Sequence, residues 1–231
     1  MSHPNNKVSS SSVDNQEIEL IVGNSSSNFS GVTSTMLQVT SLQKHMINLR
    51  IMGKHFVPDP SMTITFWEVA KMCRRPLSNG KWRIFHARRV DEMIQGVILK
   101  YVFRAKIKLV FSSAAQRKRS ASTVWLSNKM DAVIAMSNRS AKYLNKPPAK
   151  INLHGVQIDN YTPAENKQEA WQALGYGGKY GIGILGRVRE QKGVHLFVEA
   201  CIKVLPKYPD VNAVVVGAIS SSNQEFVNEL K

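Results

Sequence analysis

The clearest chemical signal in this chain is a histidine followed by two arginines and two acids. An apolar run ends at His86, and Arg88 and Arg89 follow before a helical pattern begins. In open α/β sheets ligands bind beyond the carboxyl ends of the strands, and guanidinium groups suit bidentate contact with phosphate or carboxylate. We therefore predict a catalytic-site position for His86, in preference to a loop histidine bonded to backbone. Asp91 and Glu92 need do no more than stabilise the helix N-terminus.

A second pair of cations lies at the two ends of one loop. Arg187 and Lys192 are five positions apart, after an apolar run and before a helical pattern that begins at Gly193. Free N–H groups at a helix start, flanked by cations, provide what a diphosphate needs. The spacing favours a diphosphate-binding loop over an ordinary charged surface loop.

Two further loops follow predicted strands. In the first, Ser30 is a helix N-cap type, and Gly31 would let a ligand approach the backbone closely. The alternative is an ordinary flexible loop with a serine cap. The second loop, Ser112–Ser120, carries three cations in a row. It could face the phosphates of an acceptor or lie in solvent as a basic loop, and both interpretations stay open.

One segment matches the glycine spacing of a dinucleotide-binding motif but not the structural context that the motif requires. Gly181, Gly183 and Gly186 match GxGxxG. In that motif the glycines follow a strand and open a helix. Here they lie inside an apolar run that is itself typical of a strand, so we reject this interpretation.

The elements that position these residues alternate between short apolar strands and helical segments. Nearly continuous apolar runs are typical of parallel strands buried on both faces. Strands are expected at 18–23, 48–52, 82–86, 107–111, 132–136, 150–153, 181–185 and 211–216. Helices are expected at 31–49, 63–75, 90–103, 122–129, 139–145, 164–174, 193–205 and 223–231. The alternation predicts a doubly wound α/β fold.

The charge divides the chain into two parts. The net charge is +15 over residues 1–157 and zero over residues 158–231. A turn-like segment between Gly155 and Pro163 coincides with this change. We therefore expect a disordered leader over 1–17, a first Rossmann-like domain over 18–157, and the start of a second over 158–231.

Composition excludes some classes of protein and leaves others open. No stretch of about 18 apolar residues occurs, so no membrane-spanning helix is expected. The distant Cys73 and Cys201 form no CxxC motif and suit a reducing compartment. The basic first part could bind nucleic acid, an anionic membrane surface or a phosphorylated substrate.

Taken together, these segments resemble retaining glycosyltransferases of the GT-B fold. The Gly186-Arg187…Lys192-Gly193 pattern matches the family's Gly-Arg…Lys-Gly pattern. The Ser30-Gly31 loop resembles the family's first glycine-rich loop, although Val32 replaces its second glycine. The stretches around His86 and over 131–137 are most similar to lipopolysaccharide core mannosyltransferases.

The resemblance implies an activity and its partners. Arg187 and Lys192 would bind the diphosphate of a nucleotide-sugar such as GDP-mannose, and His86 would lie near the acceptor and the transferred sugar. Arg88 and Arg89 would face the acceptor. A hexose, mannose by the resemblance to lipopolysaccharide core mannosyltransferases, would pass to a lipid-linked or lipopolysaccharide core acceptor with retention, without a metal or other cofactor. The enzyme would act in the cytoplasm, on the inner face of the cytoplasmic membrane.

The sequence lacks one motif of the family, and this absence leaves alternatives to an active glycosyltransferase open. The resemblance implies two glutamates eight positions apart, downstream of the Arg187–Lys192 loop, and none occurs before Lys231. We therefore expect an incomplete donor site and a truncated chain. The alternatives are an inactive remnant or a basic nucleic-acid-binding protein. The latter is disfavoured because no zinc spacing, helix-turn-helix or RNP-like pattern stands out.

Overall fold

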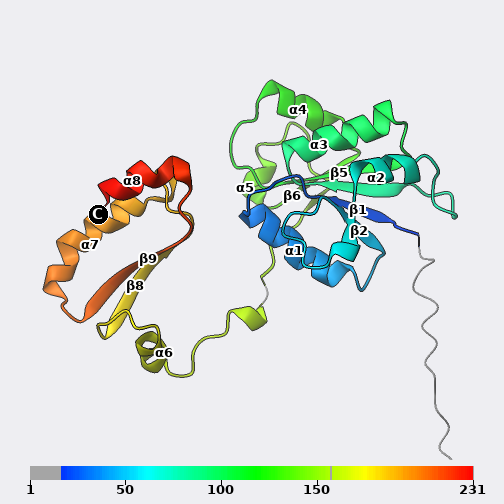
Figure 1. Cartoon of the computed structure of the whole chain (residues 1–231). Helices are drawn as coiled ribbons and strands as arrows, with labels where there is room; N and C mark the ends of the chain where they lie inside the picture. Colours follow the sequence, from blue (N-terminus) through cyan, green and yellow to red (C-terminus); the bar gives the residue numbers. More distant parts are fainter. Residues whose placement is uncertain (1–16, 157, 231) are drawn as a thin grey trace, which may run out of the picture. The chain divides into compact units, whose positions relative to one another are not determined.

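The computed structural model describes residues 17–156 and 158–230, which form two compact units (Figure 1). Unit 1 ends at residue 157, and unit 2 begins at Ile158. The expected leader at residues 1–17 lies outside the described residues except for Glu17, whose carboxylate accepts a hydrogen bond from the Ser78 N–H at 2.7 Å.

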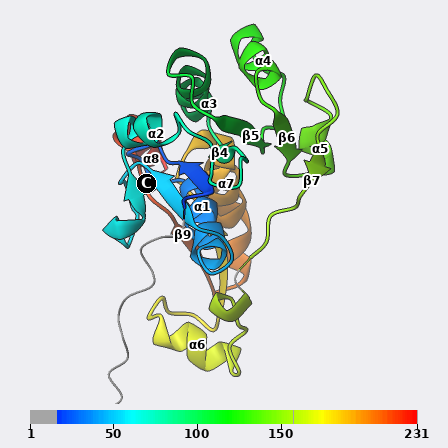
Figure 2. The same ribbon diagram turned by 90° about the vertical axis from the view of Figure 1, so that its right-hand side faces the viewer.

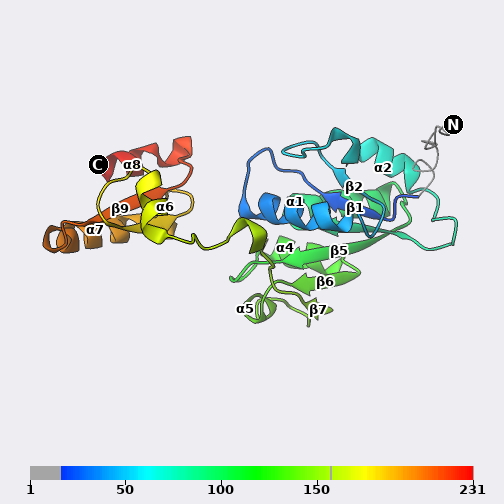
Figure 3. The ribbon, with the colours of Figure 1, turned by 90° about the horizontal axis from the view of Figure 1, so that it is seen from below.

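Unit 1 contains a seven-stranded sheet in the order β3-β2-β1-β4-β5-β6-β7, with every neighbouring pair parallel. Its strands are β1 (Leu20–Gly23), β2 (Leu49–Met52), β3 (Thr63–Ile64), β4 (Arg83–Ala87), β5 (Ile107–Ser113), β6 (Ala132–Ala135) and β7 (Lys150–Ile151). Figure 3 shows β5, β6 and β7 following one another across the sheet. The predicted α/β fold class is confirmed.

The helices of unit 1 lie on both faces of this sheet (Figure 1). They are α1 (Gly31–Gln43), α2 (Phe66–Met72), α3 (Val90–Val97), α4 (Ala121–Asn128) and α5 (Asn138–Ala141), with a π-helical turn η2 (Ile98–Val102) continuing α3. On one face α1 packs on β1 and β2 through Met36, Val22 and Ile51. On the other face α2, α3 and α4 enclose the larger core around Phe85 and Leu109.

Several predicted boundaries in unit 1 are wrong, and two of them have a local cause in the structure. The helix expected from residue 63 begins at Phe66, because Thr65 is its N-cap and forms a capping box with Glu68. The residues before it, Thr63 and Ile64, instead pair with β2 as a strand. The first helix ends at Gln43 rather than at Leu49, because Leu49 pairs with Leu20 at the start of β2.

Unit 2 contains two parallel strands, β8 (Tyr180–Leu185) and β9 (Val211–Val216), with helices α6 (Lys167–Ala173), α7 (Val194–Val204) and α8 (Gln224–Glu229). Its core is small and centres on Val188, Val194 and Val227. Gly181 and Gly183 lie inside β8, which confirms that these glycines do not follow the strand. A Cβ on Gly181 would lie 2.1 Å from the Trp171 ring, so this glycine lets the indole pack against the strand.

Candidate functional site

The strand order of unit 1 reverses between β1 and β4, and the predicted residues of unit 1 gather at the carboxyl ends of these two strands. β1 leads into the loop that opens α1 at Ser30, and β4 leads through His86 to Arg89 and α3. Val22 and His86 pair directly across the two strands. This is the topological switch point, where open α/β sheets bind ligands.

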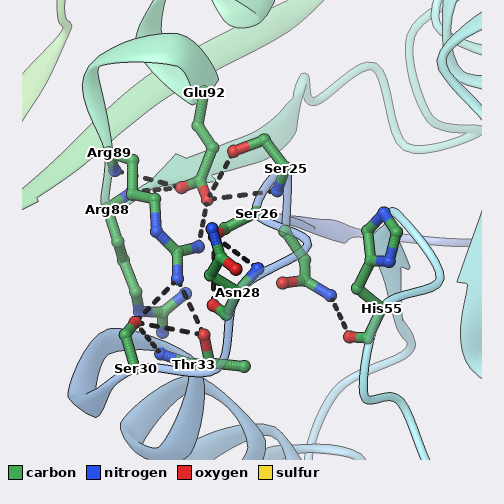
Figure 4. Close-up of polar contacts among 10 residues, drawn as sticks. Ser25, Ser26, Asn28, Ser30, Thr33, His55, Arg88, Arg89 and Glu92 are labelled. Atoms are coloured by element: carbon green, nitrogen blue, oxygen red, sulfur yellow. Dashed lines mark hydrogen bonds and ion pairs between the residues drawn. The ribbon is translucent and has the colours of Figure 1, made fainter. Parts of the chain in front are cut away.

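A buried carboxylate joins the two loops. Glu92 is completely buried and accepts hydrogen bonds from the backbone N–H groups of Arg88 at 2.7 Å and Arg89 at 3.1 Å. Across the switch point it also accepts from the N–H and hydroxyl of Ser25, at 3.4 and 3.3 Å (Figure 4). A Cβ on Gly23 would approach the Glu92 side chain to about 3.0 Å, so Glu92 lies against the end of β1. Sequence reasoning missed this role, although an acid three positions after an N-cap residue is the usual signal for such a contact.

Arg89 is used within the protein. Its Nη1 contacts the Glu92 carboxylate at 3.0 Å, and its Nη2 donates to the hydroxyls of Ser30 at 3.1 Å and Thr33 at 2.8 Å. Ser30 in turn accepts from the Thr33 N–H as the N-cap of α1. Glu92 and Arg89 thus hold the first loop and the start of α1 against the start of α3. Gly31, the first residue of α1, has open space where a Cβ would be.

Arg88 differs from its neighbour. Figure 4 shows the two arginine side chains running side by side from the start of α3 towards Ser30. Burial lowers the pKa of Arg88 to about 10, with Glu92 opposing the shift and Arg89 adding to it. Its Nη1 is buried without a hydrogen-bond partner among the described residues. A charged guanidinium with an unused donor is suited to an anionic group.

His86 is a neutral imidazole in this setting. Its Nε2 lies 2.8 Å from the Ser112 hydroxyl at the end of β5. Burial, and then the charge of Arg88, lower the pKa of His86 to about 3. At neutral pH the ring therefore offers one N–H donor and one acceptor nitrogen and carries no charge. Sequence reasoning placed His86 at the strand end but did not identify Ser112 as its partner.

The basic loop after β5 is divided between two environments. Arg119 hydrogen-bonds to Ser113 and lies over the Phe111 ring, 5.1 Å from its centroid. Its neighbours Arg117 and Lys118 are exposed. Ser113 and Phe111 alternate with Ser112 along β5, so Arg119 packs on the opposite face of the sheet from the His86–Ser112 pair.

Arg187 and Lys192 lie in unit 2, in the loop between β8 and α7. Both are exposed, whereas Val188 between them is buried. A 3₁₀ turn over Glu190–Lys192 leads to Gly193, which has a left-handed φ of 72° and precedes the first residue of α7. The order of strand, loop and helix is as predicted, with the helix beginning one residue later.

Cavities lie at both edges of the sheet in unit 1. One of about 470 Å³ adjoins the switch point. Its polar lining residues include Asn24, Ser25, Lys54, His55, Thr65 and Gln95. A larger cavity of about 720 Å³ lies by Glu19 and Asn48, at the amino edge. None of the predicted site residues line either cavity. The carboxyl edge is the better candidate, because it holds the buried and desolvated groups.

Metal and membrane features were sought within the described ranges. No cluster of three His, Cys, Asp or Glu side chains there could hold a metal ion. None of the helices in residues 17–156 and 158–230 is long and apolar enough to cross a bilayer.

Comparison with known proteins places these features in context. No protein-family model matches the chain. It is 38% identical over 220 residues, 94% of its length, to the lipopolysaccharide core biosynthesis mannosyltransferase LpcC of Rhizobium leguminosarum bv. viciae. It is 37% identical over 95% of its length to the corresponding protein LpsB of Rhizobium meliloti. The chain spans about 61–62% of the length of these relatives.

A solved structure shows the same fold. The crystal structure of Anabaena Alr3699/HepE in complex with UDP and glucose matches 93% of this chain and 65% of its own, with a TM-score of 0.64 and 18% identity. The predicted resemblance to lipopolysaccharide core mannosyltransferases and the GT-B type of architecture are therefore confirmed.

Proposed function

We propose, from the premise that this chain is homologous to the lipopolysaccharide core mannosyltransferases, that it belongs to a retaining glycosyltransferase that transfers mannose from a nucleotide-sugar to a lipid-linked or lipopolysaccharide core acceptor. The observation that carries the proposal is the 38% identity along 94% of the chain. Unit 1 is assigned as the acceptor-side domain and unit 2 as the start of the nucleotide-sugar-binding domain. The reaction takes place on the inner face of the cytoplasmic membrane.

Unit 2 supplies the donor contacts in this proposal. Arg187 and Lys192 bind the diphosphate, with the N-terminus of α7 behind them, and stabilise the charge that develops as the diphosphate leaves. GDP-mannose is the proposed donor, and the reaction needs no metal or other cofactor. The exposure of both side chains in unit 2 supports this assignment, because a ligand can reach them.

Unit 1 supplies the acceptor side. His86, kept neutral by burial, exchanges hydrogen bonds with hydroxyl groups of the transferred sugar or the acceptor. Arg88 has the unused donor and is assigned to an anionic group of the acceptor. Arg89, the other acceptor-side candidate, together with Ser30 and Gly31, acts by shaping the loop that borders the ligand.

Donor binding tests the assignment of unit 2. Calorimetric titration of the chain with GDP, GDP-mannose and UDP-glucose measures the nucleotide preference. Arg187→Ala or Lys192→Ala should weaken GDP binding by about 10–100-fold, since each removes a charge-assisted hydrogen bond. Lys203→Ala, an exposed lysine on α7, is the matched control. Equal weakening by the control would contradict the assignment.

Transfer tests the whole proposal. If the donor site is complete, labelled mannose from GDP-mannose should appear in a lipid-extracted core acceptor, and His86→Ala should lower kcat about 100-fold. Absence of transfer by the unaltered chain would favour the inactive remnant. His45→Ala, at an exposed histidine beyond α1, should leave kcat unchanged. Transfer that is unaffected by His86→Ala would remove His86 from the catalytic site.

A further inference from the structure

A serine hydroxyl at the end of β5 faces the histidine of the candidate site. In the paired strands His86 lies opposite Val110, and Ser112 follows Val110 by two residues. Side chains two positions apart on a strand point to the same face of the sheet, so Ser112 lies on the His86 side. β4 and β5 lie side by side in Figure 2, as this pairing requires. The Ser112 hydroxyl and the His86 Nε2 are 2.8 Å apart, which is a hydrogen-bond distance.

The direction of this hydrogen bond depends on where the imidazole proton lies. Because burial lowers the pKa of His86 to about 3, the ring carries one proton at neutral pH, either on Nδ1 or on Nε2. If Nε2 carries the proton, the ring donates to Ser112 and offers Nδ1 to a ligand as an acceptor. If Nδ1 carries it, Ser112 donates to Nε2 and the ring offers the ligand an N–H donor.

The surroundings of Ser112 decide between the two directions. Ser112 is only 9% exposed, and within residues 17–156 and 158–230 its hydroxyl has no hydrogen-bond partner besides Nε2. A buried hydroxyl proton without an acceptor is costly. If Ser112 accepted from Nε2, its own proton would be left in that condition. Donation from Ser112 to Nε2 satisfies both groups and places the ring proton on Nδ1.

The second ring nitrogen of His86 is open to a ligand. Nδ1 of His86 has no hydrogen-bond partner in the part of the chain that the structure describes. The buried side-chain atoms without a partner include Nδ1 of His195 but not that of His86, so solvent reaches Nδ1 of His86. Arg88, whose charge contributes to lowering the pKa of His86, has an unused donor on Nη1. With the proton on Nδ1, His86 and Arg88 both offer donors.

We propose that Ser112 is a positioning residue that holds His86 as the Nδ1–H tautomer, so that the ring contacts its ligand as a hydrogen-bond donor. The inference rests on the proposed function only for the nature of that ligand, an oxygen atom of the sugar substrate. Nε2 is occupied by Ser112 and Nδ1 already carries its proton. His86 therefore orients the ligand and removes no proton from it.

A serine beside a histidine is also the arrangement of an activated nucleophile and its base. A general base works best when its pKa lies near the operating pH, and the pKa of His86 is lowered to about 3. Within the described ranges no carboxylate accepts from Nδ1 to orient the ring as the third group of a triad. The pair is therefore suited to positioning and not to nucleophilic catalysis.

Ser113 has the same side chain on the opposite face of the sheet. It is completely buried, hydrogen-bonds to Arg119 and points away from His86. Replacing it removes a buried hydroxyl from the same strand without touching the imidazole. Ser113→Ala is therefore the matched control for Ser112→Ala.

NMR spectra of the full chain labelled with ¹⁵N-histidine measure the tautomer directly, because protonated and unprotonated ring nitrogens differ in chemical shift. The chain has six histidines, and the signals that disappear in His86→Gln are those of His86. At pH 7 we expect a protonated Nδ1 and an unprotonated Nε2. A protonated Nε2 in the unaltered chain would overturn the proposal.

Serine variants test whether Ser112 holds the proton in place. Ser112→Ala should lower the ratio of the Nδ1–H to the Nε2–H tautomer about 3–10-fold, as expected for the loss of one hydrogen bond. Ser112→Thr keeps the hydroxyl and should restore the ratio, and Ser113→Ala should leave it unchanged. Circular dichroism confirms that each variant is folded. An unchanged ratio in Ser112→Ala, or an equal fall in Ser113→Ala, would contradict the role of Ser112.

Mannose transfer measures the donor role separately. Asparagine in place of His86 keeps an N–H near the position of Nδ1 and cannot act as a base, so kcat of His86→Asn should exceed that of His86→Ala about tenfold. Equal kcat values for the two variants would overturn the donor role. Absence of transfer by the unaltered chain counts against the proposed function alone, because the tautomer ratio still decides the role of Ser112.

Discussion

The strands of units 1 and 2 have similar sequences and opposite surroundings. β1 is fully buried along Leu20–Gly23, whereas β8, with its run of Ile182 to Leu185, is exposed at all but one of its residues. Unit 1 covers its strands with helices on both faces, and the described part of unit 2 covers its two strands only partly. An apolar run therefore predicts that a strand is suited to burial, and its neighbours decide whether burial occurs.

The largest expected effect tests whether unit 1 depends on its buried carboxylate. Glu92→Ala leaves the Arg89 guanidinium and several N–H groups without their partner, at a cost of about 3–5 kcal/mol. Hydrogen exchange should accelerate in β1 and β4 and stay unchanged in β8 and β9. Glu68→Ala, at an exposed capping-box glutamate, is the control and should have a much smaller effect. Acceleration in both units would remove the distinction between them.

An identical substitution in the two units sharpens the comparison. Ile21 is fully buried in β1, and Ile182 is 43% exposed in β8. Ile21→Ala should lower the free energy of unfolding of unit 1 by about 2–5 kcal/mol. Ile182→Ala should change that of unit 2 by about 0.5 kcal/mol or less. Regional hydrogen exchange measures both, and equal effects would show that unit 2 has a buried core at β8.

The last expected effect is a pH dependence of unit 1, which is small near neutral pH and grows as the pH falls. The pKa of His86 is about 3 in the folded protein and near 6.5 in the unfolded chain, so below pH 6.5 the unfolded chain binds an extra proton. Stability is therefore complete above pH 6.5 and declines as the pH falls towards 3, by at most about 1.4 kcal/mol per pH unit. His86→Gln should flatten this decline in urea titrations. An identical pH profile for the variant would contradict the low pKa.

The sequence predicted the secondary-structure elements of the fold better than it predicted the contacts between them. Apolar periodicity and turn residues located the strands around Ile21 and Phe85, because burial on both faces leaves a direct mark on composition. The sequence pattern could not predict that Thr63 pairs with β2 as part of β3, because this pairing depends on α2 beginning only after its N-cap at Thr65. Local signals therefore sufficed for the elements but not for every boundary.

The site shows the same division. His86 was placed at its strand end from local pattern alone, whereas its partner Ser112 lies 26 residues away. Arg88 and Arg89 are equivalent by sequence and differ in the structure, because only Arg89 reaches Ser30 and Thr33, which lie 59 and 56 residues earlier. Contacts across such distances leave no periodic signal along the chain.

The Glu92 network also has an evolutionary consequence. Gly23, Ser25, Arg89 and Glu92 share one contact set, so the fitness effect of changing one depends on which residues occupy the others. If Glu92 is lost before Arg89 changes, Arg89 is left without its carboxylate partner. If a side chain is gained at position 23 before Glu92 changes, it displaces Glu92. Substitutions at these positions should therefore become fixed together.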